Sequence, residues 1–406
     1  MKRILLIMPY GSVGGMERLA LSFYNHYISI GYEVKAMKFI ALKDDIINFG
    51  KDELFLKNID FSQMSKFERM AFYFSIPRLI KKVVKKHAIT HTISFGDMAN
   101  FFSSLSYSQE FKVASIHALK SVEFTNKSFF NKIFKLSYKT TYKRLDKVVC
   151  ISKDIKEDLI SKCGFKFVNK LEVIYNPHDL KLIEKKSLEP IENKNELELF
   201  AQDSILFLGR LSIQKSPWHL IEAFNLVLET RPNTNLIFIG DGDIHVEAFL
   251  KEKIKILNIE NKVFFLGRKN NPYKYLAKAN LLALSSHYEG TPNVIVESIC
   301  VGVPIVSSFC TKGIIELMGV SSGTTNDLGQ NIDVESGIIT PNLFQGKLGI
   351  PIEKNIINHE ERKLSEAIIS VLLNTKYKKT LNNNKELLLA KFNLEKVCKK
   401  YLEINS

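Results

Sequence analysis

The sequence has no long apolar run. No stretch of its 406 residues approaches the roughly 18 consecutive apolar residues that a membrane-spanning helix requires. Lys2 and Arg3 followed by Ile4–Met8 are similar to the start of a signal peptide, but the run stops at Pro9 and no small-residue cleavage site follows. We therefore expect a first strand at this position and a chain without a membrane span.

Cysteine is also scarce. The five cysteines form no C-x-x-C pair and are too scattered in the sequence for a metal site. They are Cys150, Cys163, Cys300, Cys310 and Cys398. Because disulfides are rare in reducing compartments, this usage predicts buried thiols in a cytoplasmic protein.

Acidic residues are in deficit in the first half of the chain. Residues 1–200 hold 33 Lys and Arg against 22 Asp and Glu, a net charge of +11, whereas residues 201–406 hold 24 against 21, a net charge of +3. Such a bias suits nucleic acid or an anionic membrane, and it also arises without function in a Lys-rich proteome. No zinc finger, RRM-like aromatic motif or long Arg-rich tract accompanies the charge, so we expect no nucleic-acid partner.

The pattern of apolar residues predicts an α/β fold. Short apolar runs alternate with amphipathic stretches from end to end, which is typical of βαβ units and parallel sheets. A chain of 406 residues is long enough for two such domains, each of Rossmann type. The expected strands are Arg3–Met8, Glu33–Phe39, Thr90–Ser94, Lys112–Ile116, Lys147–Ile151, Glu172–Ile174, Ser204–Leu208, Asn235–Ile239, Lys262–Leu266, Leu281–Ser285 and Pro304–Ser307.

The expected division of the chain is residues 1–185 for the first domain, 186–385 for the second, and 386–406 for a C-terminal helix. The segment Lys185–Asp203 is charged and poor in large apolar residues, so we interpret it as the connection between domains. An amphipathic closing helix is expected at Asn393–Leu402. The polar segment Val320–Glu335 breaks the alternation, and its sequence indicates a loop without an evident role.

Two carboxylates bracket the most informative segment, Glu289–Glu297. If a helix starts near Pro292, Glu289 lies in the loop after a strand and Glu297 about one turn into the helix. In an open parallel sheet ligands bind at this edge, and backbone N–H groups at a helix start, here those of Thr291, Asn293 and Val294, attract phosphate. Since a carboxylate only accepts hydrogen bonds, it suits sugar or ribose hydroxyls. The segment therefore predicts a nucleotide-sugar site.

The same segment resembles a known family. The run Glu289-Gly290-Thr-Pro-Asn followed by Cys300–Ser307 is similar to the donor-site signature of the retaining glycosyltransferases of family 4. The resemblance implies two facing Rossmann-like domains with a cleft between them, the GT-B architecture. It implies that Glu297 binds the donor ribose and that Glu289 lies near the donor sugar. It further implies acceptor binding by the first domain, donor binding by the second, and a final helix that crosses back to the first domain.

A cationic loop follows the strand at residues 204–208. Gly209 and Arg210 end the strand, and Lys215 comes just before Pro217 opens a helix. Arg binds phosphate oxygens as a fork and Lys as a point charge, so the two can cradle a diphosphate and stabilise its departure. The alternative is that both are solvated loop residues. The resemblance, which includes Gly209-Arg210-Leu211 and Lys215, favours the diphosphate.

Three further positions in the sequence are candidates through the resemblance. Gly14, Gly15 and Glu17 follow the first strand and resemble the family's Gly-Gly-x-Glu loop, which closes over the donor diphosphate or borders the acceptor. His117 ends a strand where many members place a histidine near the donor sugar, although a lone histidine is more often structural. Arg268 follows a strand where the family's chain lines the nucleobase.

No metal or cofactor is expected. Asp241-Gly-Asp243 is similar to the Asp-x-Asp metal motif of the other large glycosyltransferase architecture, but it follows a strand as a Gly-Asp-Gly loop with no evident third ligand. If Arg210 and Lys215 neutralise the diphosphate, no metal is needed. Asn176–Asp179 resembles a turn that ends the family's first domain, and we interpret it as structural.

The segment Lys127–Leu145 contains no acidic residue. Its apolar residues recur at helical spacing, with Lys132, Lys135, Lys139 and Lys143 on other sides of one expected helix. The helix could simply pack in the first domain with a solvated basic face. Alternatively, it could dock on an anionic membrane, with Lys81, Lys82, Lys85 and Lys86 adding charge.

These observations together predict a glycosyltransferase. Within the family, the run His287–Val294 with Ile174-Tyr-Asn-Pro looks most like bacterial enzymes that build surface polysaccharide (O-antigen or capsule) on a lipid carrier. The resemblance implies transfer of a hexose or N-acetylhexosamine from a nucleotide sugar, commonly UDP-linked, to a lipid-linked saccharide at the inner face of the cytoplasmic membrane. One alternative is a UDP-sugar epimerase of the same architecture. The other is a basic, non-enzymatic polyanion-binding protein.

Overall fold

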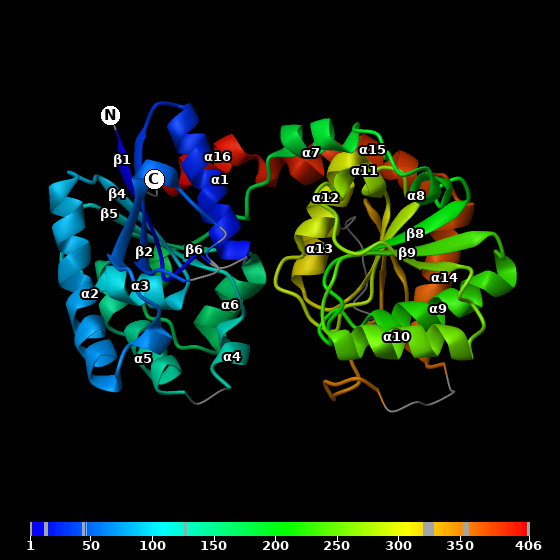
Figure 1. The fold of residues 1–406 in the computed structure, drawn as a ribbon, viewed down its shortest axis with the longest axis horizontal. Coiled ribbons are helices and arrows are strands. Elements are labelled where there is room, and N and C mark those ends of the chain that lie inside the picture. The colour runs from blue at the N-terminus through cyan, green and yellow to red at the C-terminus, as the bar shows by residue number, and fades with distance from the viewer. Residues whose placement is uncertain are drawn as a thin grey trace. The chain divides into compact units, whose positions relative to one another are not determined.

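The computed structural model describes residues 2–11, 15–42, 45, 47–125, 128–319, 329–351 and 357–403. They form two compact units (Figure 1). Unit 1 is Met1–His178 with Lys391–Ser406, and unit 2 is Asp179–Ala390. The segment Lys185–Asp203 therefore lies inside unit 2, not between the units as its composition indicates. The chain returns to unit 1 at Lys391, which brings the C-terminal helix to the N-terminal sheet.

Unit 1 contains a seven-stranded sheet in the order β3-β2-β1-β4-β5-β6-β7, with every pair parallel. Its strands are β1 (Arg3–Met8), β2 (Glu33–Ile40), β3 (Glu53–Lys57), β4 (His91–Phe95), β5 (Phe111–Ile116), β6 (Lys147–Cys150) and β7 (Leu171–Val173). Its helices are α1 (Gly15–Ser29), α2 (Lys66–Lys86), α3 (Asp97–Ser104), α4 (Lys120–Glu123), α5 (Phe129–Ser137), α6 (Lys153–Ser161) and α16 (Leu394–Tyr401). Short 3-10 helices are η1 (Gly50–Asp52), η2 (Phe61–Gln63), η3 (Thr141–Arg144), η4 (Val168–Lys170) and, at the boundary, η5 (Ala390–Phe392).

Both faces of the first sheet are covered because its central strands bury apolar side chains on both sides. In β1, Ile4 and Leu6 pack with α1 and α16, while Leu5 and Ile7 pack with α2 and α3 on the opposite face. Successive side chains of a strand point to opposite faces, so an uninterrupted apolar run requires this two-sided cover. Helix α16 is held by polar contacts as well: the hydroxyl of Tyr27 donates to the Cys398 carbonyl at 2.9 Å.

Unit 2 repeats the plan with the order β10-β9-β8-β11-β12-β14-β13, in which only β13 runs antiparallel to its neighbour. The strands are β8 (Asp203–Leu208), β9 (Thr234–Ile239), β10 (Val263–Phe265), β11 (Leu281–Leu284), β12 (Ile305–Ser308), β13 (Ile332–Val334) and β14 (Gly337–Thr340). The helices are α7 (Leu180–Ser187), α8 (Lys194–Glu198), α9 (Pro217–Thr230), α10 (Ile244–Ile256), α11 (Tyr273–Leu276), α12 (Asn293–Val301), α13 (Gly313–Met318), α14 (His359–Leu373) and α15 (Lys376–Leu389).

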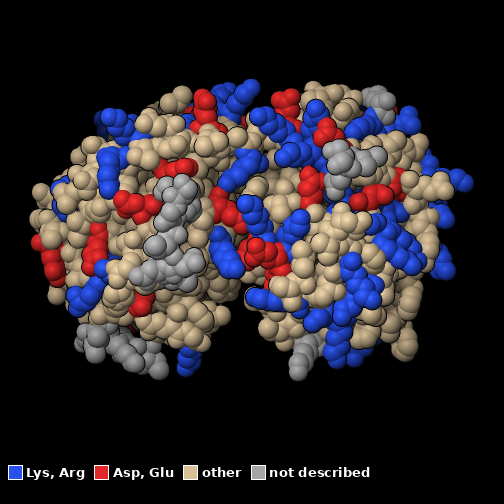
Figure 2. All heavy atoms as spheres, turned by 180° about the vertical axis from the view of Figure 1, so that it is seen from behind, with Lys and Arg blue, Asp and Glu red and all other residues tan. Residues whose placement is uncertain are grey.

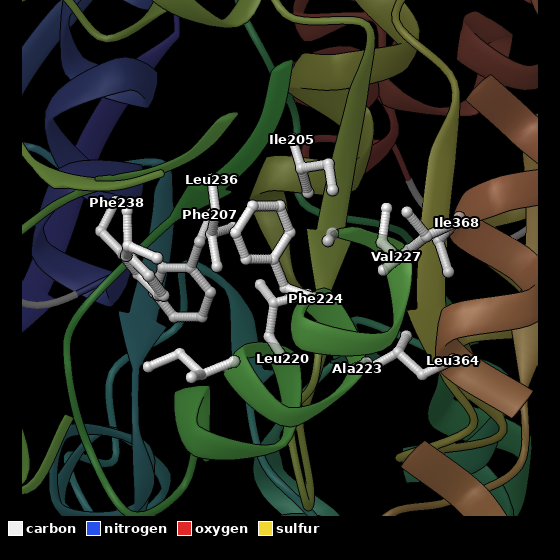
Figure 3. Packing of buried hydrophobic residues seen from close by; sticks show 14 of the residues in the cluster. Ile205, Phe207, Leu220, Ala223, Phe224, Val227, Leu236, Phe238, Leu364 and Ile368 are labelled. Atoms are coloured by element: carbon white, nitrogen blue, oxygen red, sulfur yellow. The ribbon is translucent and has the colours of Figure 1, made fainter. Parts of the chain in front are cut away.

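The core of unit 2 lies between its sheet and helices α9 and α14. Ile205 and Phe207 of β8 and Phe238 of β9 meet Phe224 of α9, and Leu364 of α14 packs beside them (Figure 3). All five side chains are buried. This packing fixes the start of α9 relative to the end of β8, which is where the cationic loop lies.

The expected α/β fold is confirmed, and each of the eleven expected strands is present with ends within one residue of the expectation. Three strands were not expected. β3 is the edge strand of its sheet, and β13 and β14 have three and four residues. The first two contain charged residues and β14 begins with Gly337, so none shows the continuous apolar run that marks the central strands.

The expectation of one helix over Lys127–Leu145 is wrong. Helix α5 ends at Ser137, and a separate 3-10 helix follows at Thr141–Arg144; Lys127 lies outside the described residues. Two adjacent β-branched residues, Thr140 and Thr141, lower helix propensity at the break. The expected apolar stripe is nevertheless buried at Phe134, Tyr138, Tyr142 and Leu145, and the four expected lysines are exposed.

Two further findings concern the cysteines and the search for membrane-spanning helices. The five cysteines are buried free thiols, as expected. Within the described ranges, no helix has the length and apolarity needed to cross a bilayer.

Candidate active site

In the second sheet, the direction in which successive strands are added reverses between β8 and β11. The chain leaves β8 toward β9 on one side, and leaves β11 toward β12 on the other, while β8 and β11 are themselves hydrogen-bonded neighbours. In open α/β sheets this switch point leaves a crevice at the carboxyl ends of the strands, where ligands bind. The loop after β8 carries Lys215 and the loop after β11 carries Glu289, so both predicted segments meet there.

Lys215 and Glu289 form an ion pair. Lys215 Nζ lies 2.5 Å from Glu289 Oε1, and the Ser286 hydroxyl donates to the same oxygen at 2.8 Å. The side-chain amide of Gln214 donates to Glu289 Oε2 at 3.4 Å and to the Tyr288 carbonyl at 3.1 Å. A carboxylate held by three donors is fixed in place, so the site is organised before any ligand enters.

Serine hydrogen bonds join the two loops beneath this ion pair. The Ser216 hydroxyl donates to the Ser285 carbonyl at 2.5 Å, and the Ser285 hydroxyl donates to the carbonyls of Lys215 and Ser216 at 3.1 Å each. Ser216 has a left-handed backbone with φ +38°, and Pro217 occupies the first turn of α9. These bonds compensate the backbone strain at Ser216, and Pro217 fixes where the helix begins.

Glycines let the loops after β8 and β9 approach closely. A Cβ on Gly240 would lie 2.0 Å from the Gly209 carbonyl oxygen, and one on Gly242 would lie 2.1 Å from the Leu211 carbonyl oxygen. The Leu211 N–H donates to the Asp241 carbonyl at 3.0 Å, and the Asp243 N–H donates to the Leu211 carbonyl at 2.8 Å. Any side chain at these glycines would separate the two loops.

Helix α12 begins at Asn293, close to the expected start. Pro292 is its N-cap, no side chain caps it, and its first turn holds no acidic residue. Gly290 and Thr291 precede it half-buried, Asn293 is exposed and Val294 is buried. Glu297 lies in the second turn, half-buried and engaged in interactions with its surroundings. An uncapped N-terminus of this kind attracts anions.

Arg210 and Arg268 are exposed at the same edge of the sheet, in the loops after β8 and β10. Asp243 is the N-cap of α10, since its side chain accepts from the His245 N–H at 2.8 Å. Among the described residues, no three His, Cys, Asp or Glu side chains cluster in a way that could hold a metal ion. The candidates for binding a diphosphate, Arg210 and Lys215, are cationic, and the Asp243 side chain caps α10.

Unit 1 holds the remaining candidates. His117 follows β5 and its Nε2 is buried without a hydrogen-bond partner among the described residues. Burial, reinforced by the nearby Lys120 ammonium, lowers the pKa of His117 to about 3. Lys120 is itself buried in ion pairs with Asp97 at 2.8 Å and Glu123 at 2.6 Å. The sequence did not indicate this cluster, because Asp97 of α3 lies 23 positions before its partner Lys120 of α4.

Glu17 lies in the first turn of α1, which begins at Gly15; Gly14 lies outside the described residues. The Glu17 carboxyl is buried, and one of its oxygens has no partner among the described residues. Burial, with a smaller contribution from the Asp45 charge, raises the pKa of Glu17. Sequence reasoning missed four residues that lie within four positions of Lys215 or Glu289: Gln214, His219, Ser286 and His287.

Comparison with known proteins defines the class. The model of "Glycosyl transferases group 1" matches residues 191–321, and that of "Glycosyltransferase Family 4" matches residues 13–182. The chain belongs to these glycosyltransferases, and the resemblance seen in the donor-site segment is confirmed.

Three similar proteins span most of the chain. An uncharacterized glycosyltransferase of Methanocaldococcus jannaschii is 29% identical over 283 residues, 69% of this chain and 68% of the relative. A Campylobacter jejuni N-acetylgalactosaminyltransferase, named for a diphospho-undecaprenol-linked saccharide, is 28% identical over 348 residues, 84% of this chain and 88% of the relative. Anabaena HepE, solved with UDP and glucose, has a TM-score of 0.70 at 18% identity over 98% of both chains. The structural likeness confirms the GT-B fold.

Proposed function

We propose that this chain is a retaining, metal-independent glycosyltransferase that moves a hexose or N-acetylhexosamine from a UDP-sugar to a lipid-linked saccharide. The observation that carries the proposal is the Lys215–Glu289 pair, at 2.5 Å, beside the uncapped start of α12. A cation and a helix N-terminus suit a diphosphate, and a fixed carboxylate suits sugar hydroxyls. Two of the reported names agree with this chemistry: the Campylobacter jejuni enzyme is named for a saccharide linked to diphospho-undecaprenol, and Anabaena HepE was solved with UDP and glucose.

The leaving diphosphate is where catalysis would be concentrated. Lys215 and Arg210 would stabilise the negative charge that grows as the bond between the sugar C1 and the diphosphate oxygen breaks. Because Glu289 is already paired with Lys215, it is better suited to orient the sugar than to attack it. The acceptor hydroxyl would then bond to C1 from the side that the diphosphate leaves, and its proton would pass to a diphosphate oxygen. This route retains the configuration and requires no protein nucleophile.

The metal-independent part of the proposal rests on the cations. Arg210 and Lys215 supply positive charge where a divalent ion would otherwise be needed, while Asp243 caps α10. Transfer should therefore persist in EDTA. Activity that disappears in EDTA and returns with manganese would contradict this part and direct attention to Asp241 and Asp243.

The lipid-linked acceptor implies a membrane surface, and unit 1 offers two neighbouring faces for it. On α2, Phe67, Met70 and Phe74 are 88%, 57% and 74% exposed and lie along one side of the helix. The same side continues into Arg78, Lys81, Lys82 and Lys85, all exposed. Helix α5 packs close by through the edge-on contact of Tyr73 with Phe130, at 5.3 Å between ring centroids, and carries exposed Phe129.

An apolar segment followed by a basic one matches the layered chemistry of an anionic bilayer surface, where aromatic residues enter the interface and lysines face headgroups. Figure 2 shows the lysines and arginines of unit 1 on the face opposite to Figure 1, with few acidic side chains among them in its lower part. We therefore place peripheral association with an anionic membrane within the proposed function.

The test of the proposed function is a donor panel. The chain is incubated with UDP-glucose, UDP-galactose and their N-acetylated forms, each with and without an undecaprenyl-diphosphate-linked saccharide, and with EDTA in parallel. Transfer that depends on the acceptor and retains the donor's configuration supports the proposal. Conversion of one UDP-sugar to another without acceptor would favour an epimerase. No binding of any UDP-sugar would favour the polyanion-binding alternative.

A further inference from the structure

Behind the Lys215–Glu289 pair lies a hydrogen-bonded chain of three side chains that the proposed mechanism does not use. His219 Nδ1 lies 2.7 Å from Glu361 Oε1, and His219 Nε2 lies 3.0 Å from His287 Nε2. His219 is in the first turn of α9, His287 is two residues before Glu289, and Glu361 is in the first turn of α14. His287 is only 5% exposed, and the Glu361 carboxyl is buried as well.

Glu361 sets the direction of the hydrogen bonds in this chain. Its carboxylate can only accept, so His219 must carry its proton on Nδ1. With its single proton on Nδ1, His219 accepts at Nε2, His287 donates from Nε2, and His287 Nδ1 keeps a lone pair. That atom is buried without a partner among the described residues. An unpartnered acceptor is more common in proteins than an unpartnered N–H, so this arrangement is favoured over the reverse one.

The chain ties together the two loops that carry the ion pair. The backbone N–H of His287 donates to the Gln214 carbonyl at 2.9 Å, and the Gln214 side chain reaches Tyr288 and Glu289. His219 stands four residues after Lys215. Glu361 anchors both loops to α14, because its other oxygen accepts from the Asn358 N–H at 3.0 Å in a capping box.

We propose that Glu361, His219 and His287 are positioning residues that hold the Glu289 loop against the Lys215 loop by fixing the tautomers of both histidines. The inference rests on the proposed function in taking the Lys215–Glu289 pair as part of the donor site. It assigns a role to α14, which is remote in sequence from both loops. If Glu289 were displaced, Lys215 would be misaligned for the leaving diphosphate. Small misplacements of a catalytic group lower the reaction rate strongly.

The decisive variant is Glu361→Gln. Glutamine also serves in a capping box, so the helix start is preserved. With the amide oxygen kept by the Asn358 N–H, the amide NH₂ faces His219, which must then accept at Nδ1. Donor and acceptor then exchange roles in both hydrogen bonds, and His287 carries its proton on the buried Nδ1 instead of on Nε2. The matched control is Glu360→Gln, which removes the same charge from the same turn; the Glu360 carboxylate accepts from the side chain of exposed Gln345 at 3.3 Å and takes no part in the histidine chain.

Two measurements separate a positioning role from a structural one. Nitrogen-15 NMR of labelled histidine, assigned with a His219→Gln variant, should find the Nδ1–H tautomer at His219 and the Nε2–H tautomer at His287 in the wild type. Both should switch in Glu361→Gln and neither in Glu360→Gln. In the transfer assay, kcat should fall at least about tenfold in Glu361→Gln relative to the control, with the acceptor KM within about twofold.

Wild-type tautomers opposite to those stated would overturn the proposal. So would switched tautomers with kinetics equal to those of Glu360→Gln, because the chain would then be structural only. The tautomer measurement needs no substrate. A failed transfer assay thus counts against the proposed function, whereas unswitched tautomers count against the positioning chain and leave the proposed function intact.

Discussion

Glu289 of unit 2 and the candidate residues of unit 1 differ in how their buried polar groups are satisfied. In unit 2, Glu289 is contacted by Lys215, Ser286 and Gln214. In unit 1, His117 Nε2 and one oxygen of Glu17 are buried with no partner among the described residues. Leaving a buried polar atom unsatisfied costs about 1–3 kcal/mol. The Glu289 carboxylate is therefore satisfied within unit 2, although the nearby His287 Nδ1 is buried without a partner, whereas each of these two unit 1 candidates keeps a buried polar atom that no described residue satisfies.

This difference also appears in protonation. Burial lowers the pKa of His117 to about 3 and raises the pKa of Glu17, so both groups shift toward their neutral forms. A neutral imidazole and a carboxyl with a raised pKa can exchange hydrogen bonds with uncharged hydroxyls, whereas the charged loops of unit 2 suit a diphosphate. The two units thus present different chemistry, and each of the following measurements tests one side of the contrast.

The largest expected effect concerns the basic surface of unit 1. Changing Lys132, Lys135, Lys139 and Lys143 to Glu should abolish binding to anionic vesicles, because each Lys near such a surface contributes about 1 kcal/mol, or roughly 4 kcal/mol in total. Vesicle co-sedimentation at low and physiological salt measures this, and binding should weaken as salt rises.

The control reverses four exposed lysines of unit 2: Lys251, Lys255, Lys378 and Lys379. It should bind like the wild type. A separate variant with Phe67, Met70 and Phe74 changed to Ser tests the apolar part of α2 and should also weaken binding. If all variants bound the vesicles equally, the basic surface of unit 1 would be a solvent-exposed face with no role in membrane binding.

Next in size is the loss of Lys215. Lys215→Ala should lower kcat about 100- to 1,000-fold, because it removes the fixed charge nearest the expected leaving group. Lys278→Ala, at an exposed lysine elsewhere in unit 2, is the control and should behave as wild type. Steady-state kinetics with saturating acceptor measures the effect. If Lys215→Ala kept the wild-type kcat, Lys215 would not stabilise the leaving diphosphate, and the assignment of diphosphate chemistry to unit 2 would fail.

Glu297→Ala should weaken donor binding. Hydrogen bonds to a charged acceptor contribute about 1.5–3 kcal/mol, which corresponds to roughly a ten- to hundredfold loss of affinity. Calorimetric titration with UDP-sugar measures it, with Glu252→Ala on the exposed face of α10 as control. Unchanged affinity would remove Glu297 from the site while leaving Glu289 and Lys215 unaffected.

The smallest effect is on acid stability. The pKa of His117 is lowered, so the unfolded chain binds a proton that the folded chain does not. Stability is therefore lost as pH falls below the ordinary histidine pKa of about 6.5, continuing until pH approaches 3. Between pH 7 and pH 5, His117→Asn should lose about 2 kcal/mol less than the wild type in urea unfolding. Equal losses would mean that His117 is protonated in the folded protein.

The sequence predicted the central strands and the loops after β8 and β11 because both are encoded locally. Continuous apolar runs mark central strands such as β1 and β8. The candidate site residues of Gly209–Lys215, and those of Glu289–Glu297, lie within a few sequence positions of one another. The Glu361–His219–His287 chain could not be predicted, since its contacts join residues 68 and 142 positions apart. The break after Ser137 was missed because the buried stripe keeps its helical spacing across Thr140 and Thr141.

The most direct test of the central claim is a crystal structure of the chain with UDP. The account predicts the diphosphate at the carboxyl ends of β8 and β11, with oxygens within about 3 Å of Lys215 Nζ and of backbone N–H groups at the start of α12. It also predicts the base near Arg268, after β10. UDP bound at the carboxyl end of β1 in unit 1, with the Lys215–Glu289 pair untouched, would contradict it.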